Sequence, residues 1–291
     1  MLPFFKTTKV NSACNVWHPE SFTALLAEIR HIQDLLASNG RAALFRGHRS
    51  SQWLLDSTFV RSIKQHLFGL APGQRFSAQL QHSADLHNTL ACALMLKFGC
   101  LLRPSDELSI QSNNHRLDCY FELIKRIQQH PEEDKVKSPP GLIGTNFIDF
   151  SRSLNIALYF ANDGRTDDEM GAVYVLDTAG AGPVLVNEPV EAVFQKIRDK
   201  LTDTEFTSSN GLPLFFCPSR QIKDLRADNQ QAFYVAQMDL RYELEFVWQQ
   251  LPQNPLIKLI LPKGSVDEVS AYLRQHGISA DYVYPKTDTT T

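Results

Sequence analysis

Hydrophobic residues recur every three to four positions in several long segments of the chain, and this spacing predicts amphipathic helices. The clearest pattern spans 19–38, where one face carries Phe22, Leu25, Leu26, Ile29, Ile32 and Leu36. Asn39-Gly40 follows it and supplies a left-handed C-terminal stop. The same spacing predicts helices at about 77–98, 116–129, 154–161 and 265–275.

Short continuous apolar runs predict buried strands. The first such run, Ala42–Phe45, is followed by Arg46-Gly47, and we expect the strand to stop at the glycine. Further strands are expected at 146–150, 171–176, 214–216, 232–236, 245–248 and 256–261. Because helices come mostly first and strands afterwards, the order favours an α+β fold, with a mixed central sheet flanked by a largely N-terminal helical lobe.

The chain has 291 residues and shows no break in composition that would divide it. We therefore expect an N-terminal arm and helix over 1–39, one large domain over 40–287 with a helical insertion at about 62–140, and a polar tail over 288–291. A hydrophobic content of 43% is enough to form a core.

Charge and cysteine usage narrow the classes of protein to which the chain can belong. A formal net charge of −3 gives no overall basic field to attract nucleic acid non-specifically. The five cysteines are scattered and form no C-x-x-C pair, so we expect reduced thiols, no zinc site and a cytoplasmic location. Neither a secretory signal pattern nor a stretch of roughly 18 apolar residues, the length that spans a bilayer, is visible.

Common catalytic motifs do not occur in the sequence. There is no G-x-x-x-x-G-K-[ST] loop, no G-x-G-x-x-G fingerprint, no H-E-x-x-H pair and no G-x-S-x-G elbow. P-loop nucleotide hydrolysis, zinc-dependent proteolysis and serine-hydrolase chemistry of the α/β-hydrolase type are therefore not expected.

Arg46 is the most informative polar residue, because it stands at the end of an apolar run. A guanidinium group keeps its charge and presents a planar fork of donors, so it needs a carboxylate, a phosphate or ribose oxygens there. A structural ion pair is the simpler alternative. We expect His48, next to Arg46 and Arg49, to be structural and disfavoured in its protonated form.

Five short segments, in the right order, resemble motifs of the FRG domain family over about residues 40–287. They are Phe45-Arg46-Gly47 with Trp53-Leu54-Leu55 and Arg61; Thr145–Ser151 with Ala157–Ala161; Gly171–Asp177; Pro218 with Arg226, Gln230, Gln231 and Phe233; and Leu261-Pro262-Lys263 with Leu273, Gly277-Ile278 and Tyr284-Pro285. The chain departs from the family where Pro139–Gly144 replaces Q-H-x-G-L-P, and where Asn146 and Phe150 replace an arginine and a tryptophan. This chain therefore lacks the histidine and the arginine that the family has in this segment.

The resemblance implies, by analogy of fold, an ADP-ribosyltransferase-like arrangement around an NAD cleft. Arg46, Ser151 and Gln230 are the implied catalytic residues: the arginine holds ribose or phosphate oxygens, the serine orients the nicotinamide side, and the glutamine binds ribose hydroxyls. Asp149, Arg226 and Gln231 are implied to bind NAD with Arg46 and Ser151. Because a glutamine cannot act as a carboxylate base, Glu243, Glu245, Asp149 or the target itself would have to take the proton.

The resemblance therefore implies that NAD is a substrate, which is either hydrolysed or used to transfer ADP-ribose to a protein or nucleic-acid acceptor. It also implies that the protein works in bacterial toxin or phage-defence systems. A shared fold does not establish a shared reaction. A non-catalytic module that binds a nucleotide or phosphate stays open as the alternative. We expect Asp149 and Ser151 to lie near Arg46, with Arg226 and Gln230 in the same cleft.

Simple structural roles also stay open for three of these residues. Ser151 could cap the helix that follows it. Asp149 could pair with Arg46 or Arg226, and Gln230 could satisfy backbone groups at the start of a strand.

Overall fold

The computed structural model describes residues 15–101, 134, 138–139, 141–182, 184–185, 212–216 and 225–285 of the chain. The helix expected at 116–129 and the tail at 288–291 lie outside the described residues, as does most of the expected helical insertion beyond Leu101.

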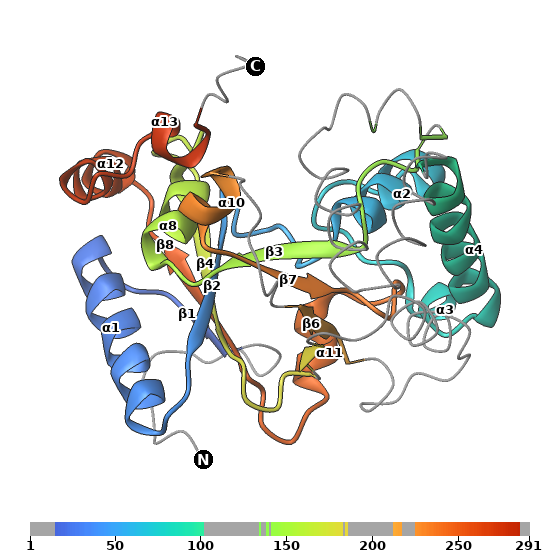
Figure 1. Cartoon of the computed structure of the whole chain (residues 1–291), viewed down its shortest axis with the longest axis horizontal. Coiled ribbons are helices and arrows are strands. Elements are labelled where there is room, and N and C mark those ends of the chain that lie inside the picture. The colour runs from blue at the N-terminus through green and yellow to red at the C-terminus, as the bar shows by residue number, and fades with distance from the viewer. Residues whose placement is uncertain are drawn as a thin grey trace, which may run out of the picture.

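One mixed, open sheet runs through the molecule (Figure 1). Its strands lie in the order β1 (Asn15–Trp17), β8 (Leu256–Leu261), β4 (Gly171–Asp177), β2 (Ala43–His48), β3 (Phe147–Ser151), β7 (Ala232–Ala236), β6 (Leu214–Phe216) and β5 (Val184–Leu185). β1 with β8 and β5 with β6 are parallel pairs, and the other neighbours are antiparallel. The expected combination of helices with a mixed central sheet is thus confirmed.

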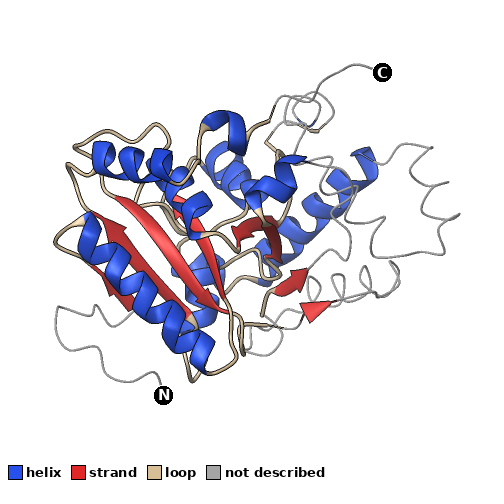
Figure 2. Ribbon diagram, turned by 60° about the vertical axis from the view of Figure 1, so that its left-hand side comes forward, coloured by secondary structure: helices blue, strands red, loops and turns tan. Residues whose placement is uncertain are grey.

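Four helices cover one face of β2, β4 and β8: α1 (Phe22–Ser38), α8 (Leu154–Asn162), α12 (Val266–Gln275) and α13 (Ala280–Val283). Figure 2 shows α1 lying across the strands. The face of α1 predicted from the spacing is the buried one, and the Ser21 hydroxyl caps the helix by accepting a hydrogen bond from the Ala24 N–H.

A second group of helices packs against the other end of the sheet (Figure 1). It consists of α2 (Thr58–Phe68), α3 (Ala78–Gln81) and α4 (Ala84–Leu101). Buried apolar side chains of α2 and α4 meet those of β3, β6 and β7 in one cluster. The helix expected at 77–98 is therefore two helices, because the Ser83 hydroxyl accepts from the Leu86 N–H and begins a new helix.

Two expectations about secondary structure are wrong. Residues 245–248, expected as a strand, belong to helix α11 (Leu244–Gln249), where Leu244, Val247 and Trp248 place one apolar face in the core. Four residues are too few for their periodicity to separate a strand from a helix. Gly47 does not end β2, which continues to His48.

The role of Gly47 is to allow close packing. A Cβ atom at this position would collide with the backbone of Ala157 and Ala161, so the absence of a side chain lets α8 lie directly on β2.

The sheet divides between β2 and β3. β2 pairs with β4 along its whole length, and β3 does the same with β7, yet β2 and β3 share only the pair Phe45 and Ser151. Figure 1 shows β3 and β7 running away from β2 towards α2. Arg46 and the residues that follow it therefore lie beside an opening in the sheet.

No helix among the described residues combines the length and the apolar character that crossing a bilayer requires.

Candidate functional site

A cavity of about 260 Å³ lies where β2 and β3 separate, and we call it the first cavity. It is lined by Phe45, Arg46, Gly47, His48, Arg49, Trp53, Arg61, Asp149, Phe150, Ser151, Ile156, Ala157, Phe160, Arg226, Gln230 and Ala232. Five of the six predicted site residues are in this set, although they come from β2, β3 and the helix α10 (Leu225–Gln230).

Arg46 spans the opening between the two strands. Its Nη1 donates a hydrogen bond to the backbone carbonyl of Asp149, and its Nε donates to Nε2 of His48 at 3.0 Å. Burial, with a smaller effect of Arg61, lowers the pKa of Arg46 to about 10, so the guanidinium group stays charged at neutral pH. The fork of Arg46 is thus fixed in direction at the wall of the cavity.

His48 is neutral and orients Arg46. The bond from Arg46 requires Nε2 of His48 to carry a lone pair, which leaves the ring proton on Nδ1. Burial lowers the pKa of His48 well below its usual range, and the charges of Arg46, Arg61 and Lys258 lower it further. The expectation of a structural, unprotonated histidine agrees with this geometry.

Arg49, Trp53 and Arg61 also line the cavity, although sequence reasoning assigned them no role in it. The guanidinium carbon of Arg49 lies 5.3 Å from the centre of the Trp53 ring. Arg61 comes from α2 and donates to the Asp56 carbonyl at 3.1 Å and to Oγ1 of Thr58 at 2.9 Å. Ser57, which caps α2, and the spacing of the apolar residues after it were the available signal for this helix.

Asp149 and Ser151 emerge from the same side of β3, as their alternation predicts. Asp149 is exposed, and its charge raises the pKa of both Arg46 and Arg61. The Ser151 hydroxyl donates to the Gln230 carbonyl at 2.7 Å and accepts from the Ser153 N–H at 2.9 Å. The cap of α8 is Ser153, so Ser151 is not that cap.

Arg226 and Gln230 occupy one side of α10, four positions apart. The Arg226 guanidinium carbon lies 4.8 Å from the centre of the Tyr284 ring. The side-chain amide of Gln230 donates to the Val283 carbonyl at 3.0 Å, which ties α10 to α13. The expectation that Gln230 satisfies a backbone group therefore describes one of its contacts, although the partner belongs to α13 and not to a strand.

Gln231 does not line the cavity and is exposed, contrary to its predicted role in NAD binding. Its φ angle of 46° is the left-handed conformation that ends α10 and starts β7. In this position its backbone carbonyl accepts from the Arg152 N–H at 3.1 Å.

Glu243 and Glu245, named as alternative proton acceptors, are buried away from the first cavity. Glu245 accepts from the Leu55 N–H at 2.7 Å and from the Tyr174 hydroxyl at 2.6 Å. Glu243 pairs with Arg75. Of the three carboxylates considered, Asp149 is the one that lines the cavity.

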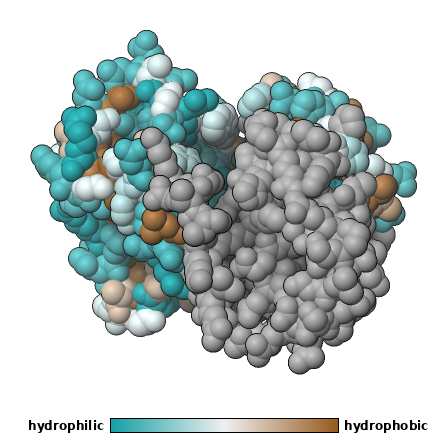
Figure 3. Space-filling view, turned by 45° about the horizontal axis from the view of Figure 1, so that its top comes forward, coloured by the Kyte–Doolittle hydropathy of each residue, from teal (hydrophilic) through white to brown (hydrophobic). Residues whose placement is uncertain are grey.

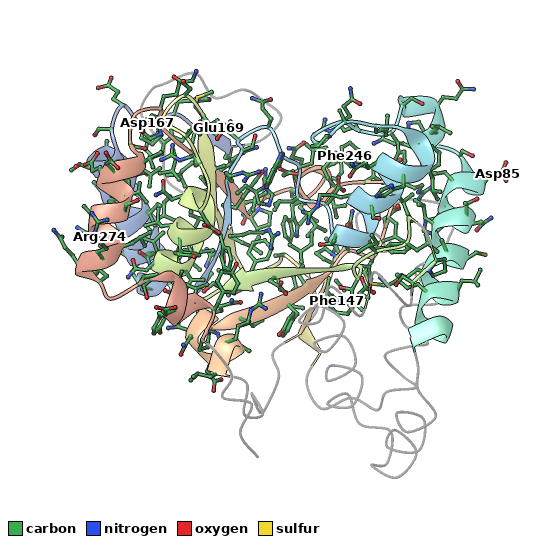
Figure 4. The ribbon with its side chains drawn as sticks, turned by 90° about the horizontal axis from the view of Figure 1, so that it is seen from above. Asp85, Phe147, Asp167, Glu169, Phe246 and Arg274 are labelled. Atoms are coloured by element: carbon green, nitrogen blue, oxygen red, sulfur yellow. The ribbon has the colours of Figure 1, made fainter. Side chains whose placement is uncertain are left out.

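The charge balance of the first cavity is strongly positive. Among the described residues that line it, Arg46, Arg49, Arg61 and Arg226 face the carboxylate of Asp149, in a protein whose overall charge is −3. Figure 4 shows β3 crossing from the α8 side towards α2, with Phe147 at the end near α2. Such a site suits an anionic ligand with several oxygen acceptors.

No family model, curated protein or solved structure matches this chain.

Proposed function

We propose that the first cavity binds NAD and that the protein cleaves the bond between nicotinamide and ribose, either with water or with transfer of ADP-ribose to an acceptor. The observation that carries this proposal is the set of four arginines around an opening in the sheet, with one carboxylate among them. The resemblance to the FRG family, and by analogy to ADP-ribosyltransferases, supports the same assignment.

The proposed chemistry needs few groups from the protein. The glycosidic C–N bond breaks with its electron pair leaving on nicotinamide, and the ribose carbon becomes cationic. A water molecule or acceptor group then forms the new bond at that carbon and gives up a proton. In this proposal, Asp149 stabilises the cationic sugar and takes that proton, and Arg46 holds phosphate or ribose oxygens. Both residues line the cavity, which supports these roles.

Two contacts favour a second candidate function, a module that binds the nucleotide without cleaving it. The Ser151 hydroxyl donates its proton to the Gln230 carbonyl, and the Gln230 amide donates to the Val283 carbonyl. Both side chains therefore maintain the fold in this structure. Under this alternative, Arg46 and Arg226 still bind the nucleotide, and a partner protein recognises whether the first cavity is occupied.

Incubation of the purified protein with NAD, with nicotinamide release followed by chromatography, distinguishes the two functions. We expect Asp149→Asn to keep NAD binding, measured by calorimetry, and to lower nicotinamide release at least about 100-fold, the usual size of a general acid–base contribution. Asp228→Asn, which changes an exposed carboxylate on α10 outside the cavity, is the matched control and should release nicotinamide like the wild type.

Binding of NAD without nicotinamide release by the wild type would favour the non-catalytic module. Absence of NAD binding would contradict NAD cleavage and would leave only a module for another nucleotide or phosphate. Labelled NAD added to bacterial lysate with the protein tests whether ADP-ribose is transferred to a protein or nucleic-acid acceptor.

A further inference from the structure

A second cavity of about 240 Å³ adjoins the first. It is lined by Trp53, Leu54, Asp56, Arg61, Lys64, Gln65, Leu70, Ala71, Pro72, Gly73 and Gln74. Trp53 and Arg61 line both cavities, so these two residues form the boundary between them.

The outer wall of the second cavity is a turn that several contacts hold in place. Gly69 ends α2 in a left-handed conformation, and the Leu70 N–H donates to the Lys64 carbonyl at 2.9 Å. The side chain of Gln74 accepts from the Ala71 N–H at 2.8 Å. Gly73 packs so closely on Gln52 that a Cβ atom would collide with the Gln52 carbonyl oxygen. Contacts within the protein therefore hold this wall in place.

The two cavities differ in chemistry. In the second cavity, Leu54, Leu70 and Pro72 offer apolar contact, and Lys64 is already neutralised by the carboxylate of Asp56 at 2.6 Å. Arg61 brings to this cavity the positive charge that it also presents to the first. The second cavity is thus largely apolar and the first is cationic, and Arg61 lies at the boundary between them.

We propose that the two cavities are compartments of one dinucleotide site. The nicotinamide ribose lies in the first, the pyrophosphate lies at Arg61, and the adenine lies against the apolar wall of the second. This inference rests on the proposed function. Each cavity alone is smaller than the roughly 300–1,000 Å³ of typical ligand pockets, whereas the two together fall within that range.

The test narrows the second cavity and leaves the first unchanged. Ala71 is exposed and lines only the second cavity, so Ala71→Trp fills part of it without disturbing the core. We expect the affinity for NAD, measured by calorimetry, to fall at least about tenfold, which corresponds to roughly 1.4 kcal/mol. Nicotinamide mononucleotide, which fills the first cavity and reaches Arg61, should bind the variant and the wild type equally. Ala27→Trp, on the exposed side of α1, is the matched control.

A second measurement uses the wild-type protein alone. Adenosine has no phosphate, so no charge repulsion opposes its binding beside nicotinamide mononucleotide. If the compartments are separate parts of one site, each of these ligands binds while the other is saturating. Competition between them overturns the inference, and so does wild-type affinity of Ala71→Trp for NAD.

Failure of this inference differs from failure of the proposed function. Should Ala71→Trp bind and cleave NAD as the wild type does, the ligand uses the first cavity alone and the proposed function stands. Should the wild type not bind NAD, both proposals are overturned.

Discussion

At the scale of single residues, Arg46 connects the two halves of the opening. Two of its three guanidinium nitrogens bond in different directions, Nη1 to the Asp149 carbonyl on β3 and Nε to His48 on its own strand. A lysine would keep the charge and lose this fork, because an ammonium group has no fixed plane. The geometry of Arg46, and not its charge alone, therefore sets the shape of the cavity wall.

We expect Arg46→Lys to weaken NAD binding at least about tenfold, because bidentate recognition of phosphate or ribose oxygens is lost. Its free energy of unfolding should fall by roughly 1–3 kcal/mol, because the fork makes two hydrogen bonds and His48 Nε2 is buried. Calorimetric titration and urea unfolding measure the two effects. Arg41→Lys is the matched control, since Arg41 pairs with Asp177 outside the cavity. Unchanged NAD affinity in Arg46→Lys would contradict the role given to the fork.

The juxtaposition of Arg46, Asp149, Ser151, Arg226 and Gln230 around one cavity agrees with the expectation from the sequence, although Arg226 and Gln230 come from helix α10 and not from a strand end. The sequence did not allow the partners of individual polar atoms to be predicted. The amide of Gln230 bonds to a carbonyl of α13, which is 53 positions away in the chain, and no local pattern specifies such a contact. Gln231, whose φ angle of 46° is left-handed, does not line the first cavity.

At the scale of elements, the close approach of α8 to β2 fixes the wall of the first cavity. α8 contributes Ile156, Ala157 and Phe160 to this wall, while Gly47 permits the contact. The same glycine was expected to end the strand, because a glycine after an apolar run usually marks a turn. Sequence alone does not distinguish a glycine needed for a turn from one needed for packing.

Gly47→Ala should lower the free energy of unfolding by roughly 1–3 kcal/mol, the cost of inserting a methyl group into a closely packed contact. Urea unfolding followed by circular dichroism measures this change. Gly40→Ala is the comparison, because Gly40 has a φ of 65° but open space around its Cβ position. Its cost comes from the backbone alone and should be smaller. A larger loss for Gly40→Ala would contradict the packing explanation.

Strands and helices with a long or fully apolar pattern were predicted well. β4 is buried along its whole length, and α1 buries the face that its spacing indicates. Failures came from short elements such as α11, in which tertiary packing decides the conformation more than local periodicity does. Helix α2 was not predicted, although Ser57 and the apolar spacing after it indicate a helix.

At the scale of the whole molecule, buried carboxylates make stability depend on pH. Glu243 is fully buried, and burial raises its pKa from the usual 4.5 to about 7, although the charge of Arg75 acts in the opposite direction. Between pH 4.5 and 7 the unfolded chain loses this proton while the folded protein keeps it. The folded state therefore loses stability as pH rises through this window.

Glu243→Gln removes the proton exchange at this position. We expect the variant to lose less stability than the wild type between pH 4.5 and 7, by up to roughly 3 kcal/mol for a shift of this size. Urea unfolding at several pH values measures the slope. Glu20→Gln, on the exposed surface, should keep the wild-type slope. If the unfolding free energy changes with pH equally in Glu243→Gln and in the wild type, Glu243 does not contribute to the pH dependence of stability.

The outer surface gives less information about function than the interior. Where Figure 3 shows described residues, hydrophobic side chains are scattered among hydrophilic ones and do not gather into one large patch. The positive charge of the first cavity contrasts with the overall charge of −3. Electrostatic attraction of an anionic ligand would therefore be local to the opening between β2 and β3.

Because one pair of residues joins β2 to β3, the sheet has a flexible connection at this position. Each half keeps its own ladder of hydrogen bonds, so a small tilt about Phe45 and Ser151 breaks few bonds and changes the width of the opening. A ligand bound by Arg46 on β2 and by Asp149 on β3 would connect the two parts of the sheet and restrict this tilt. The stiffness of the whole protein would then depend on whether the site is occupied.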